Sequence, residues 1–343
     1  MVKIHFLNVG HGDCTIIEHA SGNLTMLDIN NADQLDDDSR KELAEAYGIT
    51  GTNYDTDLLA SRLFNTSFRA TYLQPKGYDV ELTDPVNYYL ARWRGKPIFR
   101  FVLSHADLDH IRGVKRISQE RIPILNFWDT NHDIAEKDCL TDEDEAEWTE
   151  YQRLRKSTTE PKVFFNYRGD NNKYWNQDDA GGSGDGLYVL APTRKLRDDA
   201  NEAEDPNAHS YVIWFQYAGI KVVLGGDATE AVWESIHKNY GKNLKCHVLK
   251  ASHHGRDSGY YQPAVEAMSP QYTIVSVGKK PETDASNKYR QYCDNVWSTR
   301  WHGNIVLTIQ PDGKAVIAPE YNLETPSELA AKAVRAPLNY LGR

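Results

Sequence analysis

The sequence predicts a protein of the α/β class, because short apolar strands and amphipathic helices alternate along most of its 343 residues. Apolar residues make up 40% of the chain and charged residues 26%, a composition typical of a globular protein with a sizeable core. No apolar run approaches the ~18 residues of a membrane-spanning helix, and the first residues do not resemble a secretory leader. We therefore expect a cytoplasmic protein without membrane spans.

Cysteine spacing and net charge narrow the classes of function. The four cysteines are far apart and form no Cys-x-x-Cys pair, which argues against a disulfide framework and against a thiolate zinc site. A net charge of −10 provides no general attraction for nucleic acid. A local basic patch or bound divalent cations can offset that charge, so the chemistry must be judged from individual residues.

The chain begins with an expected antiparallel meander. Strands are predicted at residues 2–8, 14–18 and 24–29, because these apolar runs are separated by glycine-containing turns. Residues 30–83 then become polar and are interpreted as an insertion, with helices expected near residues 40–47 and 55–64.

A helix followed by a buried strand is expected next. Asp84 and Pro85 are typical of a helix N-terminus, and apolar residues recur at helical spacing as far as Trp93. The apolar run at residues 98–103 predicts a strand that ends in a cluster of polar side chains. Thr141 predicts the start of a further helix, whose acidic first turn and basic last turn complement its dipole.

The second half alternates strands and helices. Residues 168–186 are rich in Asp, Asn and Gly and are expected to form a loop within a second insertion at about residues 130–186. Helices are expected at residues 230–237 and 260–268. Strands are expected at residues 187–190, 211–217, 221–224, 246–249, 272–277 and 305–309.

The strand at residues 98–103 is followed by a dense group of metal-competent side chains. The pattern His-x-Asp-x-Asp-His consists of His105, Asp107, Asp109 and His110. Imidazole and carboxylate together suit zinc, manganese or iron. The alternative is that Asp107 or Asp109 caps the N-terminus of a helix.

Three other predicted strands end in potential ligands. Asp28 and Asp227 each follow an apolar run, and the pair His253 and His254 follows another. A single aspartate at a strand end is often a turn former, so neither Asp28 nor Asp227 is diagnostic alone.

Taken in order, these motifs resemble the metallo-β-lactamase superfamily, in particular the hydrolase domain of ComEC-like DNA-uptake competence proteins. The resemblance covers residues 2–309. It begins with Phe-Leu-Asn-Val-Gly-His-Gly-Asp at residues 6–13 and continues with Ser-His-x-Asp-x-Asp-His-x-x-Gly at residues 104–113. Asn-x-x-Ser-x-Val at residues 207–212, Gly-Asp at 226–227 and Ser-His-His-Gly at 252–255 complete it.

The resemblance implies an α/β protein with an αββα metallo-β-lactamase sandwich carrying helical and loop insertions. It would occupy residues 1–317, with residues 318–343 as a C-terminal, helical tail. Two divalent ions, zinc or manganese, are implied at one edge of the sheets. The implied metal ligands are His105 and Asp107 for one ion, Asp109, His110 and His253 for the other, and Asp227 as the bridge. Asp28, Asn207 and His209 would contact these ligands rather than the metal ions and help to orient them.

The sequence departs from the family pattern at several positions. Asp107 stands where many members have histidine, and a second histidine near Asn207 is missing unless His209 replaces it. The resulting oxygen-rich site favours manganese by ligand hardness, whereas the Irving–Williams order favours zinc. His11 stands where this branch usually has glutamine, and residues 284–288 stand in place of a Gly-His-Pro motif.

The implied activity is hydrolysis of phosphodiester bonds by a metal-activated hydroxide, with DNA as the expected substrate of a nuclease. Asp109 and His254 are the candidate catalytic residues; His254 either donates a proton to the leaving group or hydrogen-bonds to a backbone carbonyl. Alternatives are a small-molecule phosphodiesterase or esterase, or a metal-binding scaffold whose protein partner contacts the insertion at residues 30–83 or residues 325–343. His132 and His302 are expected to be ordinary surface residues.

Overall fold

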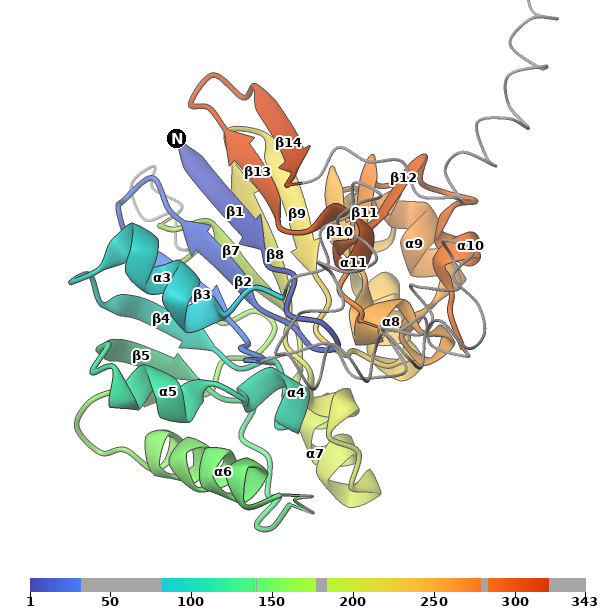
Figure 1. Ribbon diagram of the computed structural model, residues 1–343. Coiled ribbons are helices and arrows are strands. Elements are labelled where there is room, and N and C mark those ends of the chain that lie inside the picture. The colour runs from blue at the N-terminus through green and yellow to red at the C-terminus, as the bar shows by residue number, and fades with distance from the viewer. Residues whose placement is uncertain (32–81, 138, 140, 177–183, 279–282, 321–343) are drawn as a thin grey trace, which may run out of the picture.

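The computed structural model describes residues 1–31, 82–137, 139, 141–176, 184–278 and 283–320. Two mixed β-sheets pack face to face, and helices cover both outer faces (Figure 1). The αββα sandwich expected from the sequence is therefore confirmed. The helices expected at residues 40–47 and 55–64, and residues 321–343 of the expected C-terminal tail, lie outside the described residues. The first two residues of that tail, 318 and 319, end a β-strand and so belong to the sandwich.

The first sheet has eight strands. Their spatial order is β14 (Ala315–Pro319), β13 (Ile305–Ile309), β1 (Val2–Phe6), β2 (Thr15–Glu18), β3 (Leu24–Leu27), β4 (Ile98–Val102), β5 (Ile124–Trp128) and β6 (Lys162–Phe164). Pairing is antiparallel from β14 to β3 and parallel from β3 to β6. Val2 pairs with Ile309 and Phe6 with Ile305, so two distant parts of the chain lie side by side.

The second sheet has six strands. Their order is β12 (Asn295–Ser298), β11 (Tyr272–Val275), β10 (Val248–Lys250), β9 (Ile220–Leu224), β8 (Val212–Tyr217) and β7 (Leu187–Ala191). Strands β12 to β9 are parallel, and β9, β8 and β7 are antiparallel. Each sheet thus combines a meander with a parallel half whose strands end in the motifs identified above.

The helices form the two outer layers (Figure 1). On the first sheet side lie α3 (Pro85–Trp93), α4 (Leu108–Ile111), α5 (Val114–Gln119) and α6 (Asp142–Arg155). The remaining helices are α7 (Arg194–Ala203), α8 (Glu230–Tyr240), α9 (Gln262–Met268), α10 (Ser286–Tyr289) and α11 (Thr299–His302). Among the described residues, none of these helices has the length and apolar character needed to span a bilayer.

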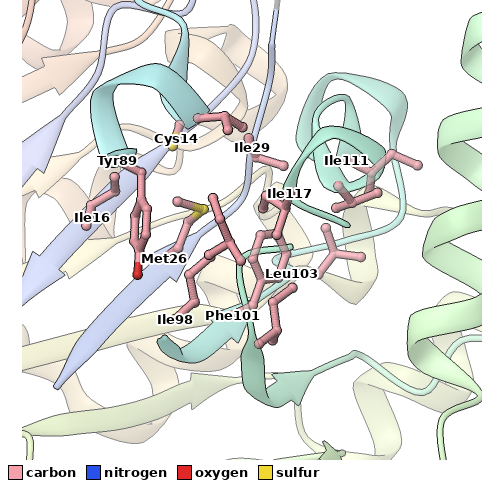
Figure 2. Close-up of a cluster of buried hydrophobic side chains, with 14 of the residues drawn as sticks. Cys14, Ile16, Met26, Ile29, Tyr89, Ile98, Phe101, Leu103, Ile111 and Ile117 are labelled. Atoms are coloured by element: carbon pink, nitrogen blue, oxygen red, sulfur yellow. The ribbon is translucent and has the colours of Figure 1, made fainter. Parts of the chain in front are cut away.

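Three separate hydrophobic clusters correspond to the three interfaces between layers. Phe101 packs under α3 and α5, whereas its neighbour Val102 faces the second sheet, because side chains alternate across a strand. In the second sheet, Val223 faces the outer helices and Val222 faces the first sheet. Figure 2 shows the first cluster, in which Tyr89 joins side chains from the strands and the outer helices.

The predicted elements are largely present. All ten expected strands form, with ends shifted by no more than two residues. Asp84 and Thr141 cap their helices as expected, accepting hydrogen bonds from the backbone N–H groups of Asn87 and Asp144. The sequence analysis missed the strands β5, β6, β12 and β14 and the helices α4, α5, α7, α10 and α11.

Residues 168–186 form no regular element where they are described, as expected for a loop, but their ends are anchored in the core. Trp175 packs on Trp128 with ring centroids 5.0 Å apart. Asp185 pairs with Arg100 of β4 at 3.2 Å, and both side chains are 2% exposed. This buried ion pair joins the two sheets.

Candidate metal centre

The ligand-bearing motifs meet at one edge of the sandwich. Asp28 follows β3, residues 104–110 follow β4, Asp227 follows β9, and residues 252–255 follow β10. The β1–β2 turn closes over this edge, where the N–H of Asp13 donates to the carbonyl of Asp109 at 3.3 Å. Gly12 permits that approach: its φ is +139°, and a Cβ there would lie 2.6 Å from the same carbonyl.

The innermost part of the site consists of His105, His110 and Asp227. All three are buried, and one ligand atom from each lies within 4.8 Å of the others. Nε2 of His110 lies 3.4 Å from Oδ1 of Asp227. Nε2 of both histidines and Oδ1 of Asp227 have no hydrogen-bond partner among the described residues. Buried polar atoms left unpaired are costly, and a divalent cation would satisfy all three, so the donor set fits a metal ion.

Asp28 orients both the loop after β4 and one of these histidines. Its Oδ1 accepts a hydrogen bond from the backbone N–H of Ser104 at 2.7 Å. Its Oδ2 lies 2.9 Å from Nδ1 of His110, which places the proton on Nδ1 and leaves Nε2 free to bind a metal. Asp28 adopts a left-handed φ of 55°, an unusual backbone conformation of the kind found at functional sites.

His254 lies deeper in the site than His253. Nδ1 of His254 donates to the carbonyl of Ser276 at 3.0 Å, while Nε2 lies 3.1 Å from Oδ2 of Asp109 and 3.4 Å from Oδ2 of Asp227. His253 lies at the rim with its Nε2 3.9 Å from Oδ2 of Asp227. Both histidines have a left-handed φ, of 53° and 49°. The structure therefore gives His254 the geometry of a metal ligand held by a backbone carbonyl.

Asp107 reaches the site but shares its carboxylate with a lysine. Its Oδ2 lies 3.3 Å from Nε2 of His105, whereas its Oδ1 pairs with Lys137. Burial would raise the pKa of Asp107, but His105 and Lys137 outweigh it and hold that pKa well below the ordinary value. Asp107 can serve a metal next to His105 only through one oxygen.

The carboxylates make the site strongly attractive to cations. Burial would lower the pKa of His254, yet Asp227 and Asp109 raise it to about 10. In the same way, burial opposes charging of His110, but Asp227, Asp28 and Asp109 raise its pKa well above the usual range. Carboxylates that draw protons onto two buried imidazoles also favour a divalent cation in the same place.

Asp13 and Lys250 form a buried ion pair below the centre, which the sequence analysis did not identify. Nζ of Lys250 lies 2.6 Å from Oδ1 of Asp13, and the two side chains are 3% and 7% exposed. Asp13 Oδ1 lies 3.9 Å from Nδ1 of His254. Burial would raise the pKa of Asp13, but Lys250 and the histidines lower it. Their sequence separation of 237 residues leaves no local signal for the pairing.

His209 and Asn207 do not join the metal-competent groups. His209 is 2% exposed, and its Nδ1 has no hydrogen-bond partner in the described part of the chain. Burial lowers the pKa of His209 to about 4, so it is neutral at pH 7. It lines a cleft of about 690 Å³ beside Asp107, together with Lys137. Asn207 begins the short 3₁₀ turn η3 (Asn207–His209), whose following residue Ser210 accepts a hydrogen bond from the N–H of Asp227 at 3.1 Å.

Two histidines expected at the surface are buried instead, so that prediction is wrong. His132 is 5% exposed because its ring packs on Tyr151, whose hydroxyl donates to Asp129 at 2.7 Å. His302 is 4% exposed and stacks on Trp297 with ring centroids 5.1 Å apart. His11 lies next to His254, with ring centroids 4.5 Å apart, and its Nε2 is 3.2 Å from Arg256.

Comparison with known proteins gives local sequence matches. No protein-family model matches the chain. ComE operon protein 3 of Bacillus subtilis is 35% identical over 96 residues, which are 27% of this chain and 11% of that protein. Competence protein ComA of Neisseria gonorrhoeae is 29% identical over 102 residues, which are 28% of this chain and 15% of that protein. The matches thus span only a small part of these much longer relatives.

Among solved structures, the metallo-β-lactamase fold protein YhfI of Bacillus subtilis aligns with 93% of this chain and 100% of its own, at 8% identity and a TM-score of 0.44. The fold itself is seen in the two mixed sheets between helical layers, with ligand-bearing loops at one edge. The chain has the metallo-β-lactamase fold and is a distant homologue of the two competence proteins.

Proposed function

We propose that the protein is a metal-dependent hydrolase that cleaves phosphodiester bonds, with DNA as its substrate. One observation carries the proposal: unpaired atoms of His105, His110 and Asp227 converge in a buried site surrounded by carboxylates. Two divalent ions bound there would lower the pKa of a water molecule and neutralise charge that develops on phosphoryl oxygens. Such a reaction requires no serine or cysteine nucleophile.

The buried and the more exposed residues of the centre would have different roles. His105, His110 and Asp227 would hold the ions from below, with Asp28 fixing the orientation of His110. Asp109 is 23% exposed while Asp227 is 4% exposed, so Asp109 faces the side from which substrate and water arrive. The carboxylate of Asp109 would accept a hydrogen bond from the attacking water and align it.

Support for a DNA substrate comes from the resemblance to the hydrolase domain of DNA-uptake competence proteins, which is an analogy of family. A second candidate, a small-molecule phosphodiesterase, is favoured by the cleft beside Asp107. Its lining includes Asp133, Glu136 and Glu204, which would repel a polyanionic strand on that side. The two candidates share the same centre and differ in the size of the substrate.

Hydrolysis assays with supplied metal test the proposal. The purified chain would be incubated with manganese, zinc or magnesium and either linear DNA, single-stranded DNA, RNA or bis(p-nitrophenyl) phosphate. We expect cleavage of DNA, and loss of all cleavage in Asp109→Ala and His110→Ala with the fold retained. The control Asp199→Ala removes an exposed carboxylate on α7 and should retain full activity.

Cleavage of the small diester alone would replace the nuclease by the small-molecule phosphodiesterase. Unchanged turnover in both Asp109→Ala and His110→Ala would refute the assigned centre. Tight metal binding without any hydrolysis would favour the scaffold hypothesis.

A further inference from the structure

A small polar pocket lies beside the metal centre, at the ends of β11 and β12 and next to α10 and α11. Its volume is about 130 Å³. Its polar lining includes Asp284, Ser286, Asn287, Arg290, Ser298 and Arg300. The segment 284–288 is the one that stands in place of the family's Gly-His-Pro motif, so this wall is a feature of this chain's own sequence.

Backbone contacts connect the pocket rigidly to His254. The carbonyl that accepts from Nδ1 of His254 belongs to Ser276, and the residues on either side of it, Val275 and Val277, line the pocket. The backbone N–H of Ala285 donates to the carbonyl of Gly255 at 2.8 Å, which ties the opposite wall to the residue after His254. A single strand end therefore separates the pocket from the metal centre.

Close packing keeps this geometry fixed. Gly255 has a φ of +77°, and a Cβ there would lie 2.9 Å from Cγ1 of Val275. Any larger residue would push this wall of the pocket outward. The loop that carries His254 and the wall of the pocket are thus packed as one unit.

The donors in the pocket suit an anion. Arg290 lines it and forms no ion pair with any described residue. Oγ of Ser298 is buried and has no hydrogen-bond partner in the described part of the chain. The lining carboxylate of Asp284 accepts a hydrogen bond from Ser286 at 2.6 Å. A guanidinium and a hydroxyl at one small site are typical of phosphate recognition.

The volume of the pocket limits the size of the group that it can bind. By the same measure a single water needs ~10–15 Å³, and organic ligands usually occupy ~300 Å³ or more. A pocket of about 130 Å³ therefore accepts one small anionic group but not a whole nucleotide. The cleft lined by His209 carries three carboxylates and one lysine, whereas the pocket carries one carboxylate and two guanidinium groups, so the anionic part of a substrate is favoured on the side of Arg290.

We propose that this pocket binds the phosphate next to the scissile one, so that the substrate is a chain with at least two phosphodiester groups. This inference rests on the proposed hydrolase and specifies its substrate class. Arg290 would act as a specificity residue, because an isolated diester has no second phosphate to place near it.

Binding without catalysis is the first test. The chain, freed of metal by a chelator, would be titrated with a fluorescent single-stranded oligodeoxynucleotide at several salt concentrations. Arg290→Gln should weaken binding about ten-fold, the equivalent of ~1.4 kcal/mol, and reduce the dependence of log Kd on log salt by ~0.7. Arg290→Lys should restore most of the salt dependence. Arg153→Gln, on the exposed face of α6, is the matched control and should change neither quantity.

Kinetic measurements with metal present distinguish the role of the pocket from that of the metal centre. For Arg290→Gln and for Ser298→Ala, we expect KM for the oligonucleotide to rise about ten-fold with kcat nearly unchanged. Hydrolysis of bis(p-nitrophenyl) phosphate, which has one phosphate, should be unaffected in both variants.

The outcomes distinguish this inference from the proposed function. If the wild-type chain hydrolyses the small diester but Arg290→Gln and Ser298→Ala leave oligonucleotide binding and KM unchanged, the pocket assignment is wrong and the hydrolase stands. If binding depends on Arg290 but neither substrate is hydrolysed, the pocket stands only as a phosphate-binding site, and both the proposed hydrolase and the subsite next to a scissile phosphate fail. A loss of small-diester hydrolysis in Arg290→Gln would assign Arg290 to the centre itself and overturn the pocket.

Discussion

Two buried ion pairs join the sheets of this protein, and they differ in what surrounds them. Arg100 and Asp185 lie within a set of neutral hydrogen-bond partners: Thr25 accepts from Arg100 at 2.7 Å, and Ser21 donates to Asp185 at 2.6 Å. Asp13 and Lys250 lie against the histidines and carboxylates of the metal centre. Arg100 is four residues before Ser104 on the same strand and its extension, about 13 Å from the site edge at the usual rise of a strand.

The different surroundings of the two pairs indicate that a buried ion pair can have more than one role. The Arg100–Asp185 pair is satisfied by its own neighbours, so it acts on the stability of the sandwich. Lys250 adds a positive charge next to a group of carboxylates that favours cations, so the Asp13–Lys250 pair also sets how strongly the centre attracts a metal. The two pairs should therefore respond alike to denaturant and differently to metal.

Breaking either pair should produce the largest loss of stability. Arg100→Met and Lys250→Met each leave a buried carboxylate without its partner, so the free energy of unfolding of the metal-free chain should fall by about 3–5 kcal/mol. Urea denaturation in the presence of a chelator measures this loss. Equal stability of wild type and either variant would show that the pair contributes nothing in that position.

Variants of the two ion pairs should differ in how they change the affinity for metal. Asp13→Asn leaves Lys250 unneutralised and should weaken metal binding about ten-fold, whereas Lys250→Met removes a repelling charge and should strengthen it. Asp185→Asn should leave the affinity unchanged, because its neighbours are not metal ligands. Titration calorimetry with zinc or manganese measures the metal affinity of all three variants. If Asp13→Asn and Lys250→Met both raised the affinity, or both lowered it, this electrostatic account would be contradicted.

Added metal should stabilise the fold by an intermediate amount. At a free metal concentration of a hundred times Kd, the gain in the free energy of unfolding is about 2.7 kcal/mol. The gain should persist in Arg100→Met, where the centre is intact, and vanish in Asp227→Asn, where a central donor is lost. Thermal unfolding with and without metal measures it; stabilisation of Asp227→Asn equal to wild type would place the metal elsewhere.

A dependence of stability on pH is expected in the Arg100–Asp185 region. Burial lowers the pKa of His19 to about 4, and His19 hydrogen-bonds to Thr25, the residue that also accepts from Arg100. The unfolded chain takes up this proton near pH 6.5, so the free energy of unfolding falls as pH drops from 6.5 to 4, by at most ~1.4 kcal/mol per pH unit. His19→Gln should reduce that slope in metal-free protein. Identical slopes would mean that His19 is already charged in the folded state.

The sequence predicted the site better than it predicted the pairs below it. His105 and Asp227 each come three residues after an apolar strand, and His110 lies in the short helix that follows His105, so the strand pattern places all three at one edge. Asp13 and Lys250 come from different sheets, and their meeting depends on how the sheets pack. The order of the two adjacent histidines was equally inaccessible, because left-handed backbone at both positions turns His254 inward and leaves His253 at the rim.

The missed elements have a common physical reason. Helix α7 has only three apolar residues, Leu196, Ala200 and Ala203, and only Ala200 is buried, so its apolar face is narrow and gives a weak signal in the sequence. Strands β6 and β14 lie at the two edges of the first sheet and are largely exposed, with three and five residues. Such segments gain their structure from a neighbouring strand, which local sequence patterns do not contain.

The pairing of β1 with β13 has a consequence for synthesis on the ribosome. Residues 2–6 emerge about 300 residues before their partners at residues 305–309, which follow almost all the other strands described. Until then one side of β1 has a row of unpaired backbone groups, which favours association with other nascent chains. The rate at which the chain is translated, and the chaperones that meet it, should therefore determine how much correctly folded protein a cell obtains.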